Sequence, residues 1–137
     1  MTVKRNNADL KKTISQIKEL RERYGNISLS DRGALMNQTY AFANQFGFML
    51  ELALAMTVSA LMRDESRGAH FKADFPERND ESWLKTTIAS YEREGPKIFY
   101  RPVDTRHYPN LEKRDYAHAK KKKPTLEKIP PNIQLPL

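Results

Sequence analysis

The stretch from Glu65 to Trp83, ESRGAHFKADFPERNDESW, decides how the rest of the chain is arranged. It is dense in charge, yet it contains a tryptophan and two phenylalanines, and it follows an apolar segment without a linker. Gly68 can adopt a positive φ and so allow a sharp turn, whereas Pro76 interrupts any helix or strand that runs through it. The run Asn79-Asp80-Glu81 can cap a short helix that begins near Ser82. We therefore expect an ordered polar connector between helical and strand-forming segments; the simpler alternative is a solvated loop.

An amphipathic helix is predicted near the beginning of the chain. Asn7 can cap a helix that begins at Ala8, and Gly25 suits its end. The basic residues of this segment lie mostly on the opposite side from its apolar residues, which predicts a solvated face, with an acidic partner as the alternative. The apolar residues recur every three or four positions and form one helical stripe: Leu10, Ile14, Ile17, Leu20 and Tyr24.

A second helix is expected from about Leu35 or Asn37 to Met62. Residues 46–61 are apolar on nearly every side, but this run is shorter and more interrupted than the roughly 20 apolar residues of a membrane span. A helix that is apolar on most sides must be covered on most sides. One amphipathic helix and a hairpin provide too little cover, so the pattern predicts a further helix, a larger parent protein or self-association.

The segments Thr86 to Glu92 and Lys97 to Val103 predict a β-hairpin. Both are rich in β-branched and aromatic residues, and Gly95-Pro96 lies between them. The predicted fold class is therefore mainly α, an antiparallel helical bundle with an appended hairpin at about 86–103. Residues 1–103 would form this domain, and residues 104–137 an extended, basic, proline-containing tail. The residues expected on the apolar face of the hairpin are Ile88, Ile98 and Tyr100.

Composition and charge limit the possible function classes. The 137 residues contain no cysteine, which excludes disulfides, zinc–thiolate sites and thiol nucleophiles. The formal net charge is +7, but residues 112–128 alone contribute +4, with seven Lys or Arg against three acidic residues. The excess charge therefore lies mainly in a tail, whereas a nucleic-acid-binding domain has a basic patch on a folded face.

No catalytic, cofactor-binding or metal-binding residue is predicted. The five glycines are scattered and form neither a dinucleotide-binding fingerprint nor a phosphate-binding loop. The three histidines lack metal-ligand spacing, and no serine lies in a nucleophile elbow. The acidic residues between Asp74 and Glu81 alternate with Lys72 and Arg78, which favours mutual neutralisation over a binding site.

Several motifs follow one another here in a specific order. ESRGAH at 65–70 is followed by an acidic-Pro-Arg-Asp run, by Trp83-Leu84-Lys85 and by Tyr100-Arg101-Pro102-Val103, and IPPNI stands at 129–133. With these motifs the chain resembles the C-terminal domain of the succinate dehydrogenase and fumarate reductase flavoprotein subunits, from about Ala8 onward. In that family the ESRGAH-type segment ends a long helix, and a further helix precedes the first one predicted here. The resemblance therefore implies a truncated subunit with at least one helix missing upstream.

The resemblance implies a parent oxidoreductase that interconverts succinate and fumarate. The parent would hold FAD in an N-terminal domain and close a capping domain over the dicarboxylate. It would pass electrons to an iron–sulfur subunit and, with a membrane anchor, lie at the cytoplasmic inner face of the membrane. The family's flavin-linking and substrate-binding residues lie upstream, so this chain is expected to bind no FAD, to be inactive alone and to pack on the flavin-binding and capping domains. The residues expected at that inter-domain interface are Arg67, His70 and Arg101.

Two other readings of the sequence stay open. A related flavoprotein such as an aspartate oxidase shares part of the ESRG signature. A free-standing helical module that uses its basic tail on nucleic acid belongs to a different class, and the location of the excess charge argues against it. We therefore expect no nucleic-acid partner, although the isolated fragment could self-associate through its apolar helix.

Overall fold

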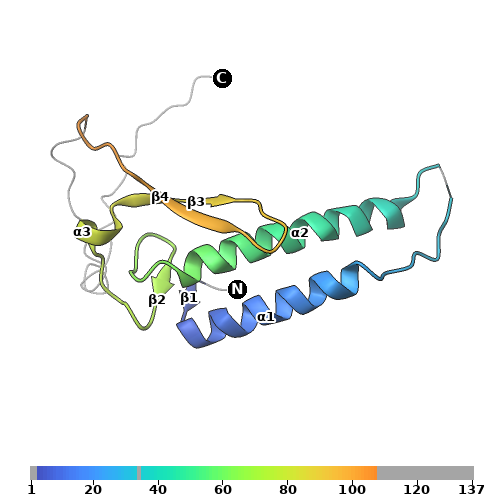
Figure 1. The fold of residues 1–137 in the computed structure, drawn as a ribbon, viewed down its shortest axis with the longest axis horizontal. Coiled ribbons are helices and arrows are strands. Elements are labelled where there is room, and N and C mark those ends of the chain that lie inside the picture. The colour runs from blue at the N-terminus through green and yellow to red at the C-terminus, as the bar shows by residue number, and fades with distance from the viewer. Residues whose placement is uncertain (1–2, 34, 108–137) are drawn as a thin grey trace, which may run out of the picture.

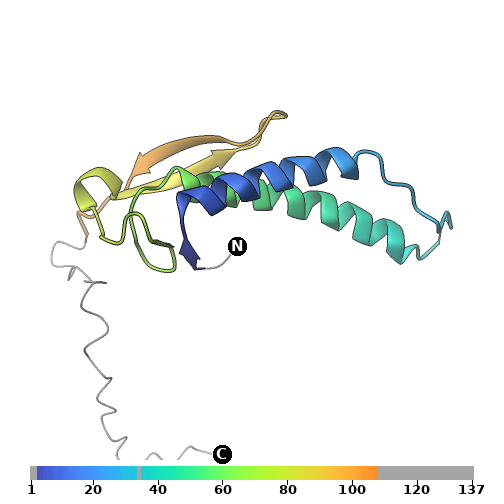
Figure 2. The ribbon, with the colours of Figure 1, turned by 90° about the horizontal axis from the view of Figure 1, so that it is seen from below.

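The computed structural model describes residues 3–33 and 35–107. Two long antiparallel helices lie side by side, and a β-hairpin lies along one side of the pair (Figures 1 and 2). This arrangement confirms the predicted mainly α fold with an appended hairpin. The domain boundary at 103 and the tail at 104–137 stay predictions, because residues 108–137 lie outside the described part. The elements in order are β1 Lys4–Arg5, α1 Asn7–Tyr24, α2 Gln38–Leu61, β2 Phe71–Lys72, α3 Asp80–Trp83, β3 Lys85–Ser90 and β4 Lys97–Pro102.

Helix α1 begins one residue earlier than the sequence predicted. Its N-cap is Asn6, whose side-chain oxygen accepts a hydrogen bond from the backbone N–H of Asp9 at 2.8 Å. The predicted cap, Asn7, is already helical, so that prediction is wrong by one residue; two adjacent asparagines have the same capping chemistry. Leu10 and Ile17 are buried, and Ile14 and Tyr24 pack against the core, as the predicted stripe requires; the prediction is wrong for Leu20, which is 37% exposed.

Helix α2 begins where one of the two predicted starting points lies. Asn37 is its N-cap and accepts a hydrogen bond from the backbone N–H of Tyr40 at 2.8 Å. The helix packs against α1 through a small core made by Leu50, Leu54 and Ile17. This core lies in the middle of the helix pair and holds the two helices side by side.

Gly47 lets the two helices approach closely. The ring of Tyr24, at the end of α1, lies over this glycine, and a Cβ atom added at Gly47 would stand 2.6 Å from the Tyr24 hydroxyl oxygen. Real Cβ atoms are not found at such a distance, so a side chain at position 47 would have to displace the Tyr24 ring. Tyr24 in turn packs edge-on against Phe46, with ring centroids 6.0 Å apart.

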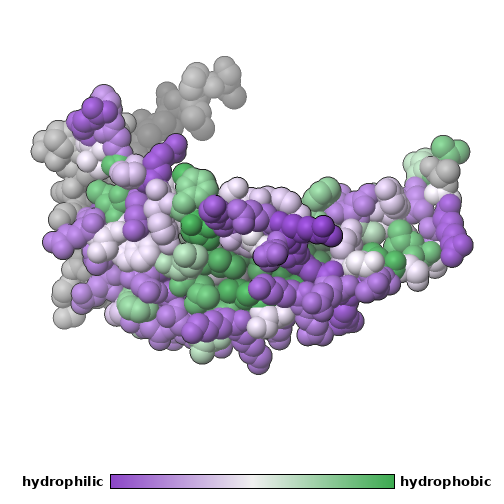
Figure 3. All heavy atoms as spheres, viewed as in Figure 1, coloured by the Kyte–Doolittle hydropathy of each residue, from purple (hydrophilic) through white to green (hydrophobic). Residues whose placement is uncertain are grey.

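One side of α2 is not covered by the described residues. Five large apolar side chains there retain 58–71% of their surface exposed. At 100° per residue they fall within an arc of about 120°, so they form one face. Figure 3 shows hydrophobic residues gathered over the middle of the helix pair and again over the N-terminal half of α2. We call the five residues the open face of α2: Phe42, Phe48, Met49, Leu52 and Met56.

By length and composition alone, α2 could cross a membrane. The prediction from residues 46–61, that the apolar segment is too short to span, is therefore wrong for the whole helix of 24 residues. The buried helices of water-soluble proteins meet the same criterion, and α2 contains Glu51, which forms an ion pair with Arg21 of α1 at 2.8 Å. Length and composition thus establish only that α2 needs apolar cover.

The hairpin lies close to its predicted bounds, but its faces differ from the prediction. Ile88 pairs directly with Phe99 across the two strands. Directly opposed residues lie on the same face and neighbours along a strand alternate, so Ile98 and Tyr100 share the other face. The prediction that all three apolar residues share one face is wrong for Ile88, because the cross-strand register depends on the turn.

A short parallel strand pairing joins β1, near the beginning of the chain, to β2, which lies within residues 65–83. Strand β1 pairs with β2, and the backbone N–H groups of Phe71 and Ala73 donate to the carbonyls of Val3 and Arg5, at 3.2 and 2.8 Å. This pairing was not predicted, because two residues are too few to show an alternating pattern. The predicted turn at Gly68 is confirmed by its φ of 59°.

Candidate functional site

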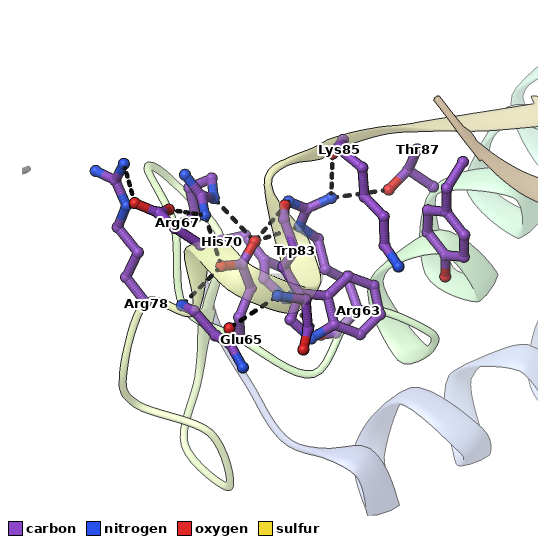
Figure 4. A network of polar contacts seen from close by, with 12 residues as sticks. Arg63, Glu65, Arg67, His70, Arg78, Trp83, Lys85 and Thr87 are labelled. Atoms are coloured by element: carbon purple, nitrogen blue, oxygen red, sulfur yellow. Dashed lines mark hydrogen bonds and ion pairs between the residues drawn. The ribbon is translucent and has the colours of Figure 1, made fainter. Parts of the chain in front are cut away.

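The signature loop, residues 65–79 between α2 and α3, folds over the C-terminal end of α2 (Figure 4). Glu65 and Lys72 are completely buried in the described structure, and Ser66 is 2% exposed. Charged groups are buried in proteins only when they are paired and hydrogen-bonded. The loop is therefore an ordered polar connector, as predicted, and the alternative of a solvated loop is wrong.

The Glu65 carboxylate accepts five hydrogen bonds. Oε1 accepts from Nε and Nη2 of Arg63 at 2.8 and 2.5 Å and from Nε of Arg67 at 2.9 Å. Oε2 accepts from Nη2 of Arg67 at 3.0 Å and from the backbone N–H of Asn79 at 3.2 Å. Burial by itself raises the pKa of Glu65, but the hydrogen bonds from Arg67, Asn79 and Arg63 outweigh it and the pKa is lowered. Glu65 is thus a carboxylate at neutral pH.

Arg63 joins the end of α2 to the hairpin. Besides Glu65, its guanidinium donates to the backbone carbonyls of Trp83 at 2.6 Å and Lys85 at 3.0 Å, and to the Thr87 hydroxyl at 3.1 Å. The guanidinium also lies 5.5 Å from the centre of the Trp83 ring, a cation–π distance. Its planar fork of donors matches these acceptors in a way that a lysine could not.

Arg67 continues the network outward. Its Nη2 donates to Asp80 at 2.6 Å, and Asp80 also accepts from Arg78 at 2.7 and 2.9 Å. The bonds from Arg78 first, and then those from Arg67, lower the pKa of Asp80 to about 2 against the opposing effect of burial. Arg63, Glu65, Arg67, Asp80 and Arg78 thus form a row of alternating charges.

Lys72 closes the C-terminal end of α2 from within the loop. Its Nζ donates to the backbone carbonyls of Leu61 at 2.8 Å and Arg63 at 3.2 Å, and to Asp64 at 2.6 Å. The last carbonyls of a helix lack partners inside the helix and carry partial negative charge. A buried lysine therefore performs the capping here.

Ser66 closes the loop on itself. Its Oγ donates to the carbonyl of Phe75 at 2.7 Å and accepts from the backbone N–H of Lys72 at 3.0 Å. Its own N–H donates to the carbonyl of Glu77 at 3.1 Å. Ser66 thus forms hydrogen bonds to residues on both sides of Pro76.

Aromatic contacts attach the hairpin at the same place. The rings of Trp83 and Tyr100 pack edge to face with centroids 5.5 Å apart, and Nζ of Lys85 lies 4.5 and 4.3 Å from the two centroids. The Tyr100 hydroxyl donates to the carbonyl of Met62 at 3.2 Å. The end of α2, α3 and the hairpin therefore meet at one junction.

The structure places the three predicted interface residues in different settings. Arg67 finds both of its carboxylate partners, Glu65 and Asp80, in this chain, so it needs no partner across a domain boundary. His70 uses both ring nitrogens within the chain, as described below. Arg101 lies exposed on β4, opposite Thr86, and no hydrogen bond or ion pair within residues 3–107 joins it to the other two. Their place in an inter-domain interface stays a prediction.

The central members of the junction were not singled out from the sequence. Glu65 lies two residues after Arg63 and two before Arg67, and Lys72 follows an apolar helix by eleven residues; neither spacing is regular in a helix or strand. The one usable signal was the density of charge beside a long apolar segment. Such charge must be paired if it is buried.

An open groove of about 810 Å³ lies between α1, α2 and the hairpin turn. The charged groups that line it are balanced, three basic against three acidic: Lys18, Arg21 and Arg93 with Glu22, Glu51 and Glu94. Arg21 bridges the groove, with an ion pair to Glu51 at 2.8 Å and a long hydrogen bond to the Arg93 carbonyl at 3.4 Å. No cluster of three or more potential metal ligands occurs within the described residues. The polar contacts within the described residues therefore hold the helices, the signature loop and the hairpin to one another.

The comparisons with known proteins agree on one family. Residues 1–116 match the family described as fumarate reductase flavoprotein C-term. The chain is 45% identical over 122 residues to a succinate dehydrogenase flavoprotein subunit of Bacillus subtilis (strain 168), which is 88% of this chain and 21% of that protein. It is 40% identical over 100 residues to a fumarate reductase flavoprotein subunit of Haemophilus influenzae, which is 72% of this chain and 17% of that protein.

A solved structure gives the same result for the fold. A chain of the E. coli quinol fumarate reductase superposes with a TM-score of 0.71 at 32% identity, covering 74% of this chain and 18% of that one. The chain thus spans about a fifth of the length of the relatives that it matches. It belongs to the family of fumarate reductase and succinate dehydrogenase flavoprotein C-terminal domains.

Proposed function

We propose that this chain is the structural C-terminal domain of a flavoprotein subunit that interconverts succinate and fumarate through FAD. Such a subunit would pass the two electrons to an iron–sulfur subunit, in a complex held by a membrane anchor at the cytoplasmic face. Family membership supports the class, and the names of the relatives support the reaction. Because the chain spans only about a fifth of those relatives, the reaction belongs to the longer protein.

The residues present do not fit a flavin-binding role. The dinucleotide fingerprint needs glycines between a strand and a helix, so that the backbone can approach the pyrophosphate. Here β1 is followed directly by α1, and the residue between them is the capping Asn6. We therefore assign FAD to another part of the parent subunit and derive no step of its chemistry from this chain.

The observation that carries the proposed role is the open face of α2. Large exposed apolar side chains gathered on one helix face indicate a contact with another protein surface or with a membrane. The flavin-binding and capping domains of the same subunit are the occupants that the family predicts, together with an upstream helix. The polar junction at the other end of α2 satisfies its own charges, so it would hold the domain rigid while the open face docks. Of the three predicted interface residues, the exposed Arg101 is the most accessible to the rest of the subunit.

A chimera tests this role directly. The corresponding C-terminal region of the Bacillus subtilis subunit would be replaced by this chain, and flavin content and succinate-dependent dye reduction would be measured. We expect the chimera to retain flavin, and Leu52→Asp with Met56→Asp to reduce that retention at least several-fold. The matched control is Gln16→Asp, which introduces the same group on the exposed side of α1. Unchanged flavin retention in the Leu52 and Met56 variants would overturn the docking role.

The isolated chain provides the second test. We expect no saturable FAD binding and no succinate-dependent dye reduction from the purified 137-residue chain. Micromolar FAD affinity would contradict the assignment of the cofactor to the rest of the subunit. An aspartate oxidase parent would be indicated instead if a chimera with such an enzyme kept its flavin while the Bacillus subtilis chimera did not.

A further inference from the structure

His70 lies where three segments of the chain meet. It lies in the signature loop, half-buried between β1, the end of α2 and β2 (Figure 4). Its Nδ1 is within hydrogen-bond distance of Nη1 of Arg5, and its Nε2 lies 3.2 Å from the carbonyl oxygen of Arg63. His70 thus connects β1 to the residue that follows α2.

The two partners determine which ring nitrogen carries the proton. A guanidinium can only donate, so Nδ1 must be the acceptor, and a carbonyl can only accept, so Nε2 must carry the hydrogen. Both contacts are satisfied only by the neutral ring in this single tautomer. A protonated ring would have N–H groups at both positions and would lose the hydrogen bond from Arg5.

The charged groups around His70 are basic on every side. Arg5 faces it from β1, Arg63 from the end of α2 and Lys72 from β2. Within residues 3–33 and 35–107 no hydrogen bond or ion pair joins His70 to a carboxylate. The nearby acids Asp64 and Glu65 are occupied by Lys72 and by two arginines.

These surroundings act on the pKa of His70 in one direction. Burial has the largest effect and lowers the pKa, the bond to the Arg63 carbonyl opposes it, and the three cations lower it further. A proton therefore binds more weakly to His70 in the closed arrangement than to a histidine in water, whose pKa is 6.5. By linkage, acid must favour an arrangement in which His70 is released.

The strand that His70 contacts is short. Strand β1 has two residues, and the backbone bonds that seat it include those from Phe71 to Val3 at 3.2 Å and from Ala73 to Arg5 at 2.8 Å. Asp74 adds one bond from the backbone N–H of Asn7 at 2.9 Å. The His70–Arg5 contact thus adds a side-chain attachment to the backbone pairing that seats β1 against the loop.

We propose that neutral His70 is a latch that fastens β1, where the chain enters this domain, to the signature loop, and that protonation of His70 opens the latch. The closed state is stabilised fully above pH 6.5. That stabilisation is lost as the pH falls from 6.5 toward the lower pKa of the closed state. In this interval the open state binds one more proton, so the ratio of open to closed molecules rises about tenfold per pH unit. The inference rests on contacts within this chain and not on the parent reaction.

Amide hydrogen exchange on the 137-residue chain tests the latch. The N–H groups of Phe71 and Ala73 donate to β1, so their protection factors report whether β1 is seated. We expect these factors to fall in the natural chain as the pH drops below 6.5, by at most tenfold per pH unit, until the pH reaches the pKa of the closed state. The N–H of Trp83, which donates to Asn79 at 3.0 Å outside the latch, should keep its protection.

The matched variant is His70→Asn, whose side-chain oxygen can stand where Nδ1 accepts from Arg5 and does not titrate. We expect the protection factors of Phe71 and Ala73 in this variant to be independent of pH between 7.5 and 5.5. An equal fall in the variant and the natural chain would overturn the proposal. So would constant protection in the natural chain across a range in which NMR shows the ring of His70 gaining a proton.

Discussion

Replacing Glu65 by glutamine tests whether the buried junction holds the domain together. The two side chains have nearly the same shape, so the change removes the charge and two acceptor lone pairs without leaving a cavity. Glu65 is completely buried and accepts five hydrogen bonds from nitrogen donors. In the variant, an amide NH2 group must face donors of Arg67 and Asn79, or those of Arg63 and Arg67.

The expected cost follows from the fate of the partners. Removing one member of a buried ion pair leaves an uncompensated charge and costs about 3–5 kcal/mol. The side chain of Arg63 is 14% exposed and that of Arg67 24%, so water can relieve part of this cost. We therefore expect the free energy of unfolding to fall by about 3 kcal/mol at pH 7, near the lower end of the range.

The assay is urea-induced unfolding, monitored by far-UV circular dichroism. If a stabilising osmolyte is added, the natural chain and the variant are measured at the same concentration of it. The control is Glu77→Gln, which makes the same chemical change on an exposed side chain of the same loop. Surface changes of this kind stay within about 0.5 kcal/mol. A Glu65→Gln variant that unfolds in the absence of urea agrees with the expectation.

The pH dependence provides a second check on the same variant. The pKa of Glu65 is lowered in the folded chain, so its stabilising effect is complete above the ordinary value of 4.5 and is lost as the pH falls through the folded-state value. The difference in the free energy of unfolding between the natural chain and the variant should therefore become smaller only at acidic pH. A loss within 1 kcal/mol of the Glu77→Gln control at pH 7 would refute the reasoning, since about 3 kcal/mol is expected.

Three further predictions concern other parts of the chain. Gly47→Ala should lower stability by about 1–3 kcal/mol through overpacking against Tyr24, although alanine normally improves a helix; in a Tyr24→Ala background the same change should instead raise the thermal midpoint. Asp80→Asn should lower the thermal midpoint by a constant amount above pH 5. This difference in midpoint should disappear as the pH falls from 3.8 toward the folded-state pKa of about 2, because the natural carboxylate then also becomes neutral. Deleting Lys120 to Leu137 should leave the thermal midpoint within a few degrees, and a large drop would show that this tail contributes to the core.

The comparison of prediction and structure is clearest in the helices. The stripe through Leu10 and Ile17 and the apolar run of α2 were readable because a helix repeats every 3.6 residues, so local spacing reports which side is buried. The same spacing indicated that α2 needs more cover than residues 3–33 and 35–107 provide. It erred by one residue at the cap of α1, where Asn6 and Asn7 offer the same side-chain oxygen.

Pairing between distant segments was beyond such reasoning. The β1–β2 contact involves two residues in each strand and has no pattern of its own. The face occupied by Ile88 depended on the cross-strand register, which the turn around Gly95 decides. In both cases the missing information was the path of the backbone between the paired segments.

The sequence by itself determined the family, the two helices, the hairpin and the presence of a charged, ordered connector, because each of these is recorded in local spacing or in an ordered set of motifs. Only the tertiary structure decided how the charges of that connector are paired. The loop contains several acids and several bases at similar separations along the chain, and electrostatic pairing depends on distance in space and on burial. Winding the loop around the end of α2 puts Glu65 between Arg63 and Arg67, turns Lys72 inward onto the last carbonyls of the helix, and sets His70 against Arg5 at the far end of the chain.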